Sequence, residues 1–127
     1  GIVVGTGNKV EDFGVGFYTK YGDGGVDISP IADCMKTEVW EMGRELGVMQ
    51  EIIDAEPTDG LWDDYRTDEQ QLGMSYFDLE RAMLLSEDYT YTADSLTKEE
   101  QDLVKRYDEI RKNNLHKMKP IPICYVK

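Results

Sequence analysis

A short apolar segment that runs directly into a glycine-rich turn is the feature that most constrains the fold. Residues 2–4 read Ile-Val-Val, and residues 5–8 read Gly-Thr-Gly-Asn. A buried strand of a parallel sheet is typically apolar along its whole length, and ligands bind at the edge where such strands end. Glycines in the turn let the backbone approach a ligand closely. The beginning of the chain therefore predicts a parallel α/β sheet with a binding site at the end of its first strand.

The next predicted elements are a second strand over residues 26–31 and a helix after it. Asp33 is expected to cap this helix, and Gly47 is expected to end it. Between them the apolar side chains recur with the spacing of an amphipathic helix: Met35, Val39, Met42 and Leu46. This order of elements is typical of a parallel α/β sheet. With only two strands evident, we expect the sheet to be poorly stable unless another segment or subunit completes it.

The second half of the chain predicts helices separated by one long loop. A short helix is expected over residues 51–55. Residues 58–73 are acidic and rich in turn-forming residues, which predicts an irregular loop whose acidic side chains face solvent. Capping boxes at residues 75–78 and 97–100 predict the starts of two further helices. Residues 116–122 are expected to be extended, because the prolines in this tail disfavour helix.

Composition limits the classes of function. The length of 127 residues allows one domain at most. The formal net charge of −12 argues against a nucleic-acid or anionic-membrane surface. No apolar run approaches the ~20 residues that span a bilayer. Cys34 and Cys124 are isolated and form no zinc signature, so we expect free thiols and a cytoplasmic protein. Because the chain begins at Gly1 without a methionine, we expect an N-terminal truncation, a tag remnant or a processed chain.

Charged residues follow the glycine-rich turn closely. Glu11 and Asp12 are acidic, and Lys9 and Lys20 are basic. Carboxylates can bind a metal ion, and lysines together with the backbone of a glycine-rich turn can bind phosphate. Each of these residues alone would more often be a solvated surface charge. The residues by themselves therefore indicate a candidate phosphate and metal site.

Several motifs occur in one order along nearly the whole chain. They are residues 5–12, 16–25, 26–31, 36–39, 44–47, 57–62 and 68–76. In this order they resemble the C-terminal half of NH3-dependent NAD synthetases, which belong to the N-type ATP pyrophosphatases. The resemblance implies a partial Rossmann-like (adenine nucleotide alpha hydrolase-like) parallel sheet with flanking helices, whose N-terminal half is missing. Residues 1–127 would be the C-terminal part of a single NAD synthetase domain.

The same resemblance implies a ligase reaction with magnesium as cofactor and with ATP and deamido-NAD as substrates. ATP would adenylate the nicotinate carboxylate and release pyrophosphate, and ammonia would then give NAD and AMP. The ATP-binding residues would be Thr6, Lys36 and Thr58. Glu11 would hold the magnesium ion, and Asp12 competes with it for this role.

Deamido-NAD would be bound by four residues: Lys20, Asp27, His116 and Lys117. The resemblance also implies a homodimer whose deamido-NAD site draws on both subunits. It identifies no further catalytic side chain.

One motif of the resembled family is absent. The pyrophosphate-binding loop of the form Ser-Gly-Gly-x-Asp-Ser does not occur between Gly1 and Lys127. We therefore expect the isolated chain to be inactive. An alternative is an inactive truncated or split chain that keeps a dinucleotide-binding and dimerisation surface, and another is a GMP or asparagine synthetase. No glutaminase region is present, which favours free ammonia as nitrogen donor, with glutamine left open.

Overall fold

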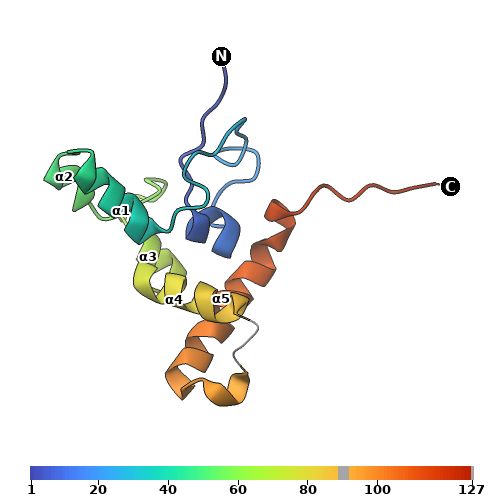
Figure 1. Cartoon of the computed structure of the whole chain (residues 1–127). Helices are drawn as coiled ribbons and strands as arrows, with labels where there is room; N and C mark the ends of the chain where they lie inside the picture. Colours follow the sequence, from blue (N-terminus) through green and yellow to red (C-terminus); the bar gives the residue numbers. More distant parts are fainter. Residues whose placement is uncertain (89–91, 127) are drawn as a thin grey trace.

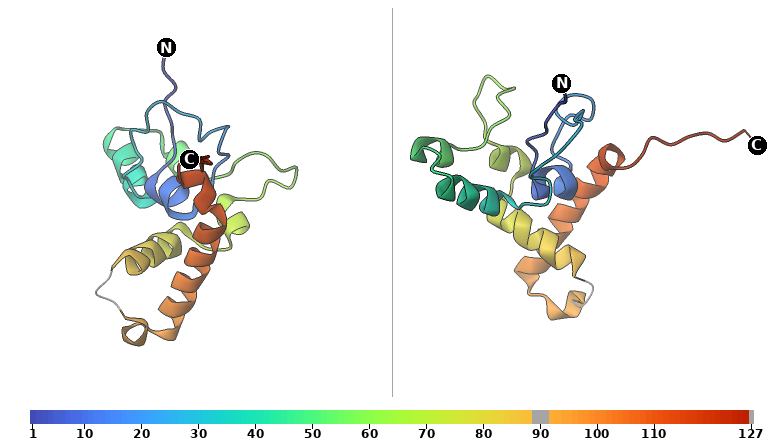
Figure 2. Two further views of the ribbon diagram at one scale, coloured as in Figure 1. Left: turned by 90° about the vertical axis from the view of Figure 1, so that its right-hand side faces the viewer. Right: turned by 45° about the horizontal axis from the view of Figure 1, so that its top comes forward.

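A computed structural model describes residues 1–88 and 92–126. Figure 1 shows a helical body from which the N-terminal segment and the C-terminal tail extend. The chain forms, in order, a π-helix η1 (Lys9–Val15), α1 (Lys36–Glu45), α2 (Gln50–Ile53), α3 (Asp68–Leu72), α4 (Tyr76–Glu87), a 3-10 helix η2 (Ala93–Ser95) and α5 (Lys98–Met118). Helices α4 and α5 pack against each other, and both contact η1 (Figure 2). The packing of α4 and α5 thus holds η1 in place.

The two predicted strands meet side by side in the predicted parallel direction. Val4 and Ile28 form a parallel bridge, and the amide of Gly5 donates to the Ile28 carbonyl oxygen at 2.7 Å. The pairing does not extend into a sheet within the described residues. The expectation of a buried first strand is wrong, because Val3 is 56% and Val4 51% exposed. No other described strand or helix covers this pair, so the sheet expected from the sequence is not formed here.

The hydrophobic core lies instead between helices. Its fully buried side chains come from η1, α4 and α5, including Val10, Val15, Tyr76, Leu79 and Tyr107. The positions on α4 and α5 follow the three- and four-residue spacing that places side chains on one helix face. The core therefore fixes η1 against the two long helices.

Helices α4 and α5 begin where the sequence predicted that they would. Thr97 caps α5, and the Glu100 carboxylate accepts from the Thr97 amide at 2.8 Å, which completes the predicted capping box. Ser75 caps α4 by accepting from the Asp78 amide at 3.1 Å. These local motifs form because the side-chain oxygens satisfy amides that have no partner inside the helix.

The predicted cap of α1 is wrong. Asp33 does not cap this helix but forms a surface ion pair with Lys9 at 3.0 Å. Met35 occupies the cap position, and the Glu38 carboxylate accepts from its amide at 2.7 Å. A carboxylate in the first turn can satisfy the same free amide, so the helix begins two residues later than Asp33 predicts. Gly47 follows the helix end in the left-handed conformation, as predicted, with φ 73°.

Three further segments differ from the sequence-based expectation. Residues 9–15 form η1, a helix for which no prediction was made from the sequence, with the Asn8 side chain accepting from the Glu11 amide at 3.0 Å. Residues 68–72 form α3 inside the predicted loop. His116 and Lys117 lie in the last turn of α5, since the helix continues to Met118 and the extended tail begins only near Pro120. No helix of the described residues is both long and apolar enough to cross a bilayer.

Gly16 is a position where an alanine substitution should be costly. Its φ is 69°, and an added Cβ would lie 2.7 Å from the Asn114 Cβ on α5. The left-handed backbone alone costs about 1–2 kcal/mol for a non-glycine residue, and the clash with α5 adds to it. We expect Gly16→Ala to lower the free energy of unfolding by about 2 kcal/mol or more, as measured by urea denaturation.

Gly47 provides the matched control for this substitution. Its φ is 73°, but no atom lies within 4 Å of an added Cβ. Gly47→Ala should therefore show the backbone cost without the clash. Equal losses in the two variants would contradict the tight contact between Gly16 and α5.

Candidate functional site

A cavity of about 340 Å³ lies where the first strand, η1, α1 and the loop before α3 converge. All four residues predicted to contact ATP phosphates or magnesium line it: Thr6, Glu11, Lys36 and Thr58. Thr6 follows the strand, Glu11 is on η1, Lys36 opens α1, and Thr58 follows Pro57. The tertiary structure thus gathers residues that are up to 52 positions apart, counted from Thr6 to Thr58.

Glu11 is the centre of the polar contacts in this cavity. The Lys36 ammonium lies 3.2 Å from the Glu11 carboxylate, and both side chains are largely buried. The Tyr76 hydroxyl donates a short hydrogen bond to the same carboxylate. Lys36 also lies over the Tyr76 ring, with 5.0 Å from the nitrogen to the ring centroid. These contacts hold Glu11 in one orientation toward the cavity.

Asp68 is the second buried carboxylate, and sequence reasoning missed it by treating it as part of a solvated face. It is only 8% exposed. Its Oδ2 lies 3.2 Å from the Tyr76 hydroxyl, and its buried Oδ1 has no hydrogen-bond partner among the described residues. Burial, and secondarily the nearby Glu11, raises the pKa of Asp68. The hydrogen bond from the Tyr76 hydroxyl acts in the opposite direction and lowers this pKa.

The sequence contained no direct signal for the role of Tyr76. This residue reads as a packing aromatic, and its ring is indeed fully buried and meets Trp40 edge-on at 5.9 Å between centroids. Its hydroxyl, however, joins two carboxylates that are far apart in the sequence. Burial together with Glu11 raises the pKa of Tyr76, so the hydroxyl remains a donor at neutral pH.

The charge of the cavity favours a cation. Among the described residues, Lys36 is the one lysine in its lining, whereas five carboxylates line it: Glu11, Asp12, Asp23, Asp59 and Asp68. Across the part of the chain that the structure describes, no group of three or more His, Cys, Asp or Glu side chains is placed to hold a metal ion by itself. Magnesium needs only one or two carboxylates when phosphate oxygens and water supply its other ligands. Glu11 and Asp12 fit a magnesium ion of that kind.

Asp12 lies against the glycine-rich turn. A Cβ on Gly7 would meet the Asp12 carboxylate, so a larger residue at position 7 would displace this side chain. Burial, then the charges of Glu11 and Asp23, raise the pKa of Asp12 from 3.8 to about 6. Its ionised form is therefore less favourable in the folded chain than in the unfolded chain.

This shift predicts a pH-dependent effect of Asp12→Asn on stability. The penalty for ionised Asp12 is absent below pH 3.8, grows as the pH rises, and is complete above pH 6. We expect Asp12→Asn to stabilise the chain at pH 7.5 by on the order of 1 kcal/mol, allowing for its partial exposure. The gain should vanish near pH 4 in urea denaturation series. A gain that is independent of pH would show that charge is not its cause.

The four predicted deamido-NAD residues do not line this cavity. Lys20, His116 and Lys117 are brought together at the end of α5, where the Lys20 ammonium donates to the His116 carbonyl oxygen at 2.8 Å. The Lys117 ammonium donates to the carbonyl oxygens of Gly16 and Tyr18, each at 2.8 Å, and burial lowers its pKa. Asp27 lies apart from them, at the strand pair.

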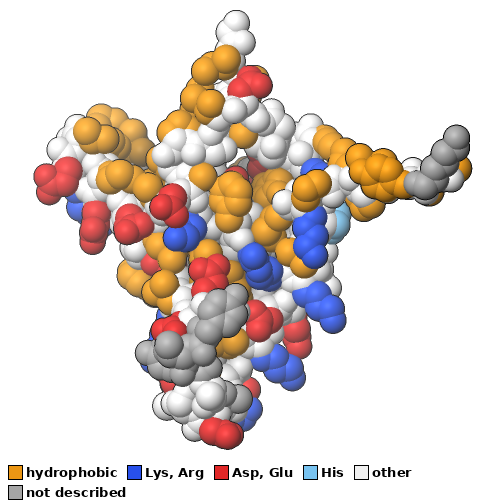
Figure 3. All heavy atoms as spheres, turned by 45° about the vertical axis from the view of Figure 1, so that its right-hand side comes forward, with side chains coloured by type: hydrophobic (Ala, Val, Ile, Leu, Met, Phe, Trp, Pro, Cys, Tyr) orange, Lys and Arg blue, Asp and Glu red, His pale blue; other side chains and the backbone are white. Residues whose placement is uncertain are grey.

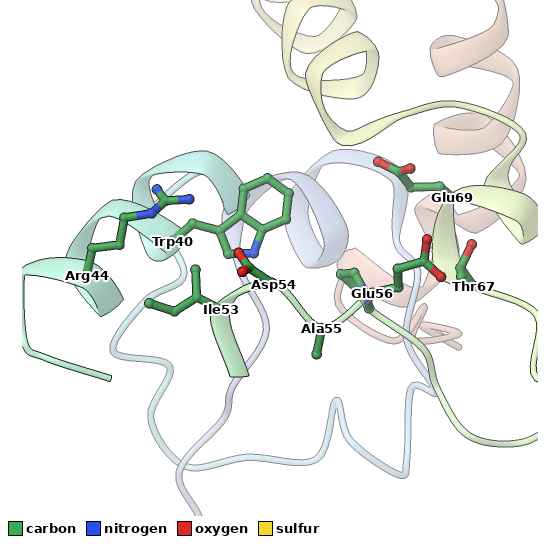
Figure 4. Close-up of a pocket in the computed structure, with 9 residues that line it drawn as sticks. Trp40, Arg44, Ile53, Asp54, Ala55, Glu56, Thr67 and Glu69 are labelled. Atoms are coloured by element: carbon green, nitrogen blue, oxygen red, sulfur yellow. The ribbon is translucent and has the colours of Figure 1, made fainter. Parts of the chain in front are cut away.

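A neighbouring cavity of about 290 Å³ adjoins the first one at Pro57. Figure 4 shows Trp40 and Arg44 of α1 on one side of it, and Glu56 and Thr67 on the other. Its lining combines the aromatic ring of Trp40 with basic and acidic side chains. The sequence motifs assign no ligand to it.

A parallel strand pair that leads into a glycine-rich turn beside an acidic, lysine-containing cavity defines a candidate cation and phosphate site. The family model for NAD synthase matches residues 1–121. The chain belongs to the NAD synthase family. The recognition made from the sequence motifs is thereby confirmed.

Two curated relatives are NH(3)-dependent NAD(+) synthetases. The one from Methanosarcina acetivorans is 40% identical over 98% of this chain and 49% of its own length. The one from Pyrococcus furiosus is 37% identical over 96% of this chain and 48% of its own length. The solved structure of NMN synthetase from Francisella tularensis matches with a TM-score of 0.76 and 31% identity, covering 97% of this chain and 46% of that one. The chain spans about half the length of these proteins.

Proposed function

We propose that this chain serves in NAD biosynthesis, as the C-terminal part of one NAD synthetase domain. The reaction is the ATP-dependent amidation of deamido-NAD with ammonia through an adenylate of the nicotinate carboxylate, giving NAD, AMP and pyrophosphate. The observation that carries the proposal is the meeting of Thr6, Glu11, Lys36 and Thr58 in one cavity. Membership of the NAD synthase family supports it.

The residues of the cavity suit the first step of this reaction. A carboxylate is a poor acyl donor until one of its oxygens becomes a good leaving group, and adenylation achieves this. Magnesium, when bound, would neutralise charge on the polyphosphate. Glu11, with Asp12 beside it, would hold that ion, and Lys36 would supply a second positive charge. Without the ion, five carboxylates would repel a nucleotide phosphate, so we expect ATP binding to require magnesium.

Thr58 is placed to deliver a hydroxyl from the loop. Its Oγ1 donates to the Arg66 carbonyl oxygen at 3.2 Å and accepts from the Gly60 amide at 3.1 Å. These bonds fold the loop back on itself beside the cavity. Thr6 is exposed at the end of the strand, where its hydroxyl is available to a ligand.

Lys20, Asp27, His116 and Lys117 complete the proposal as the deamido-NAD site. Lysine ammonium groups are suitable donors for the dinucleotide phosphates. To bind the ligand, Lys20 and Lys117 would have to release the backbone carbonyl groups that they now contact. We further propose that the working form is a cytoplasmic homodimer. The alternative is an inactive chain that keeps only a dinucleotide-binding and dimerisation surface.

A second candidate substrate comes from the solved structure. That protein is an NMN synthetase, and NMN is the amide of nicotinate mononucleotide. The same activation of a nicotinate carboxylate would serve either substrate. Nicotinate mononucleotide is therefore tested as a substrate beside deamido-NAD.

The test is a chimera built on the Methanosarcina acetivorans relative. This chain covers 49% of that protein, so residues 1–127 can replace the matching segment. We expect the purified chimera to form NAD from deamido-NAD, ATP, magnesium and ammonia, and to release pyrophosphate. The unmodified relative is the positive control. The isolated chain is tested alongside it for binding of deamido-NAD and of ATP with magnesium by calorimetry.

The outcomes separate the candidates. Amidation of the mononucleotide but not of deamido-NAD would identify the second substrate. A folded chimera without any amidation would refute the proposed enzyme. Binding of deamido-NAD by the isolated chain would then support the inactive binding alternative.

A further inference from the structure

The C-terminal half of α5 carries cations that bind backbone rather than acidic side chains. Figure 3 shows Lys and Arg side chains gathered on the face formed by this helix, although the chain as a whole has a net charge of −12. Arg111 is the most closely engaged of them. Its Nη1 donates a short hydrogen bond to the Phe13 carbonyl oxygen and a second one, of 2.6 Å, to the Gly14 carbonyl oxygen. These acceptors lie at the end of η1, 97 and 98 positions away in the sequence.

The end of η1 needs such a partner. Carbonyl groups in the last turn of any helix lack amides to accept from. π-helical turns are also uncommon and are found mostly at functional sites. A guanidinium group carries several donors in a fixed plane and so can satisfy two neighbouring carbonyls together. Arg111 therefore supplies a charged partner for the two carbonyls just before the end of η1.

The position of η1 matters because of what it presents to the cavity. Glu11 and Asp12 immediately precede Phe13 on the same short helix. Core packing holds the other face of η1 through Val10 and Val15. Lys117 secures the following segment through the carbonyl oxygens of Gly16 and Tyr18. Two cations of α5 thus hold the segment that carries both candidate magnesium ligands.

We propose that Arg111 is a positioning residue: by binding the carbonyl groups of Phe13 and Gly14 it fixes η1, and thereby places Glu11 and Asp12 at the cavity. Arg111 touches neither carboxylate and acts only through the backbone. The functional half of this inference rests on the proposed role of the cavity in holding a divalent cation. The structural half rests on the contacts of Arg111 alone.

The first experiment measures amide hydrogen exchange by NMR in the full chain. The reporters for η1 are the amide of Asp12 within it and the amide of Phe17 just after it, which donate to the carbonyl oxygens of Asn8 and Glu11. The reporter in the core is the Leu79 amide. Arg111→Met should accelerate exchange at the two η1 reporters about tenfold, because hydrogen bonds from a charged group are lost. The Leu79 amide should exchange at the wild-type rate.

Two further variants control this result. Arg111→Lys keeps the positive charge but replaces the planar guanidinium group with a single ammonium group, so it should restore part of the protection. Lys112→Met removes a neighbouring exposed cation of α5 and should leave η1 unchanged. Unchanged η1 exchange in Arg111→Met, or an equal acceleration at Leu79, would overturn the proposal. If Arg111→Met does not fold, exchange in Arg111→Lys decides in the same way.

The second experiment tests the functional half with Mn²⁺ as the probe, followed by its electron paramagnetic resonance signal. Arg111→Met should weaken Mn²⁺ binding about tenfold, and Arg111→Lys by less. Equally tight binding in wild type and Arg111→Met would overturn the positioning role alone. No Mn²⁺ binding by the wild-type chain, either alone or with ATP added as the source of phosphate oxygens, would refute the cation site itself and leave Arg111 as a structural clamp of η1.

Discussion

Replacing Glu11 by glutamine is expected to lower the rate of NAD formation by the chimera about 100-fold or more at low magnesium. The substitution keeps the size of the side chain and its ability to accept from Tyr76. It removes the charge that faces Lys36 at 3.2 Å and that would hold the metal ion. Because the defect lies in metal affinity, raising the magnesium concentration should restore part of the rate. The measurement is the rate of NAD formation over a magnesium titration.

Two other carboxylates serve as comparisons for Glu11. Asp33→Asn changes a carboxylate that is 97% exposed and forms a surface ion pair with Lys9, so it should leave the rate and the magnesium dependence unchanged. Asp12→Asn tests the competing ligand. A larger magnesium-dependent defect in Asp12→Asn than in Glu11→Gln would show that Asp12 holds the ion.

The second large effect concerns the helical core. Leu79 on α4 is fully buried among side chains of η1, α4 and α5. Leu79→Ala should lower the free energy of unfolding by about 2–5 kcal/mol, through lost burial and the cavity that remains. In a small chain with few buried side chains this is a large part of the total stability. Urea denaturation followed by circular dichroism measures it.

Leu84 on the same helix is the matched control. It is 59% exposed, so Leu84→Ala should change the free energy of unfolding by no more than about 0.5 kcal/mol. A similar loss in both variants would contradict the packing of α4 against α5. It would also place the core of the chain elsewhere.

The local features of the fold were predictable from the sequence where a few neighbouring residues decide them. The cap at Thr97 and the left-handed Gly47 are of this kind, because both depend on interactions within one helical turn. The prediction that Asp33 caps α1 was wrong for a related reason. Asp33 can serve either as a cap or as a partner of Lys9, and the sequence does not say which competitor prevails.

The extent of the sheet and of α5 could not be predicted in the same way. The apolar strand at residues 2–4 pairs with residues 26–31 in the expected direction, yet no other described element covers it. Helix α5 includes His116 and Lys117 because nothing before Pro120 interrupts it. The prolines of the tail were expected to keep residues from 116 onward out of the helix. A proline disfavours helix mainly at the residue directly before it, so its effect does not reach back to His116.

The sequence alone determined the family and the identities of Thr6, Glu11, Lys36 and Thr58 as candidate ligand contacts. Motif order carries that information because each motif is a short, contiguous run. Only the tertiary structure showed that these residues share one cavity, that Tyr76 joins Glu11 to the buried Asp68, and that Arg111 holds η1. The physical reason is distance along the chain. Contacts between residues 65 or 97 positions apart depend on how helices pack, and no local pattern encodes them.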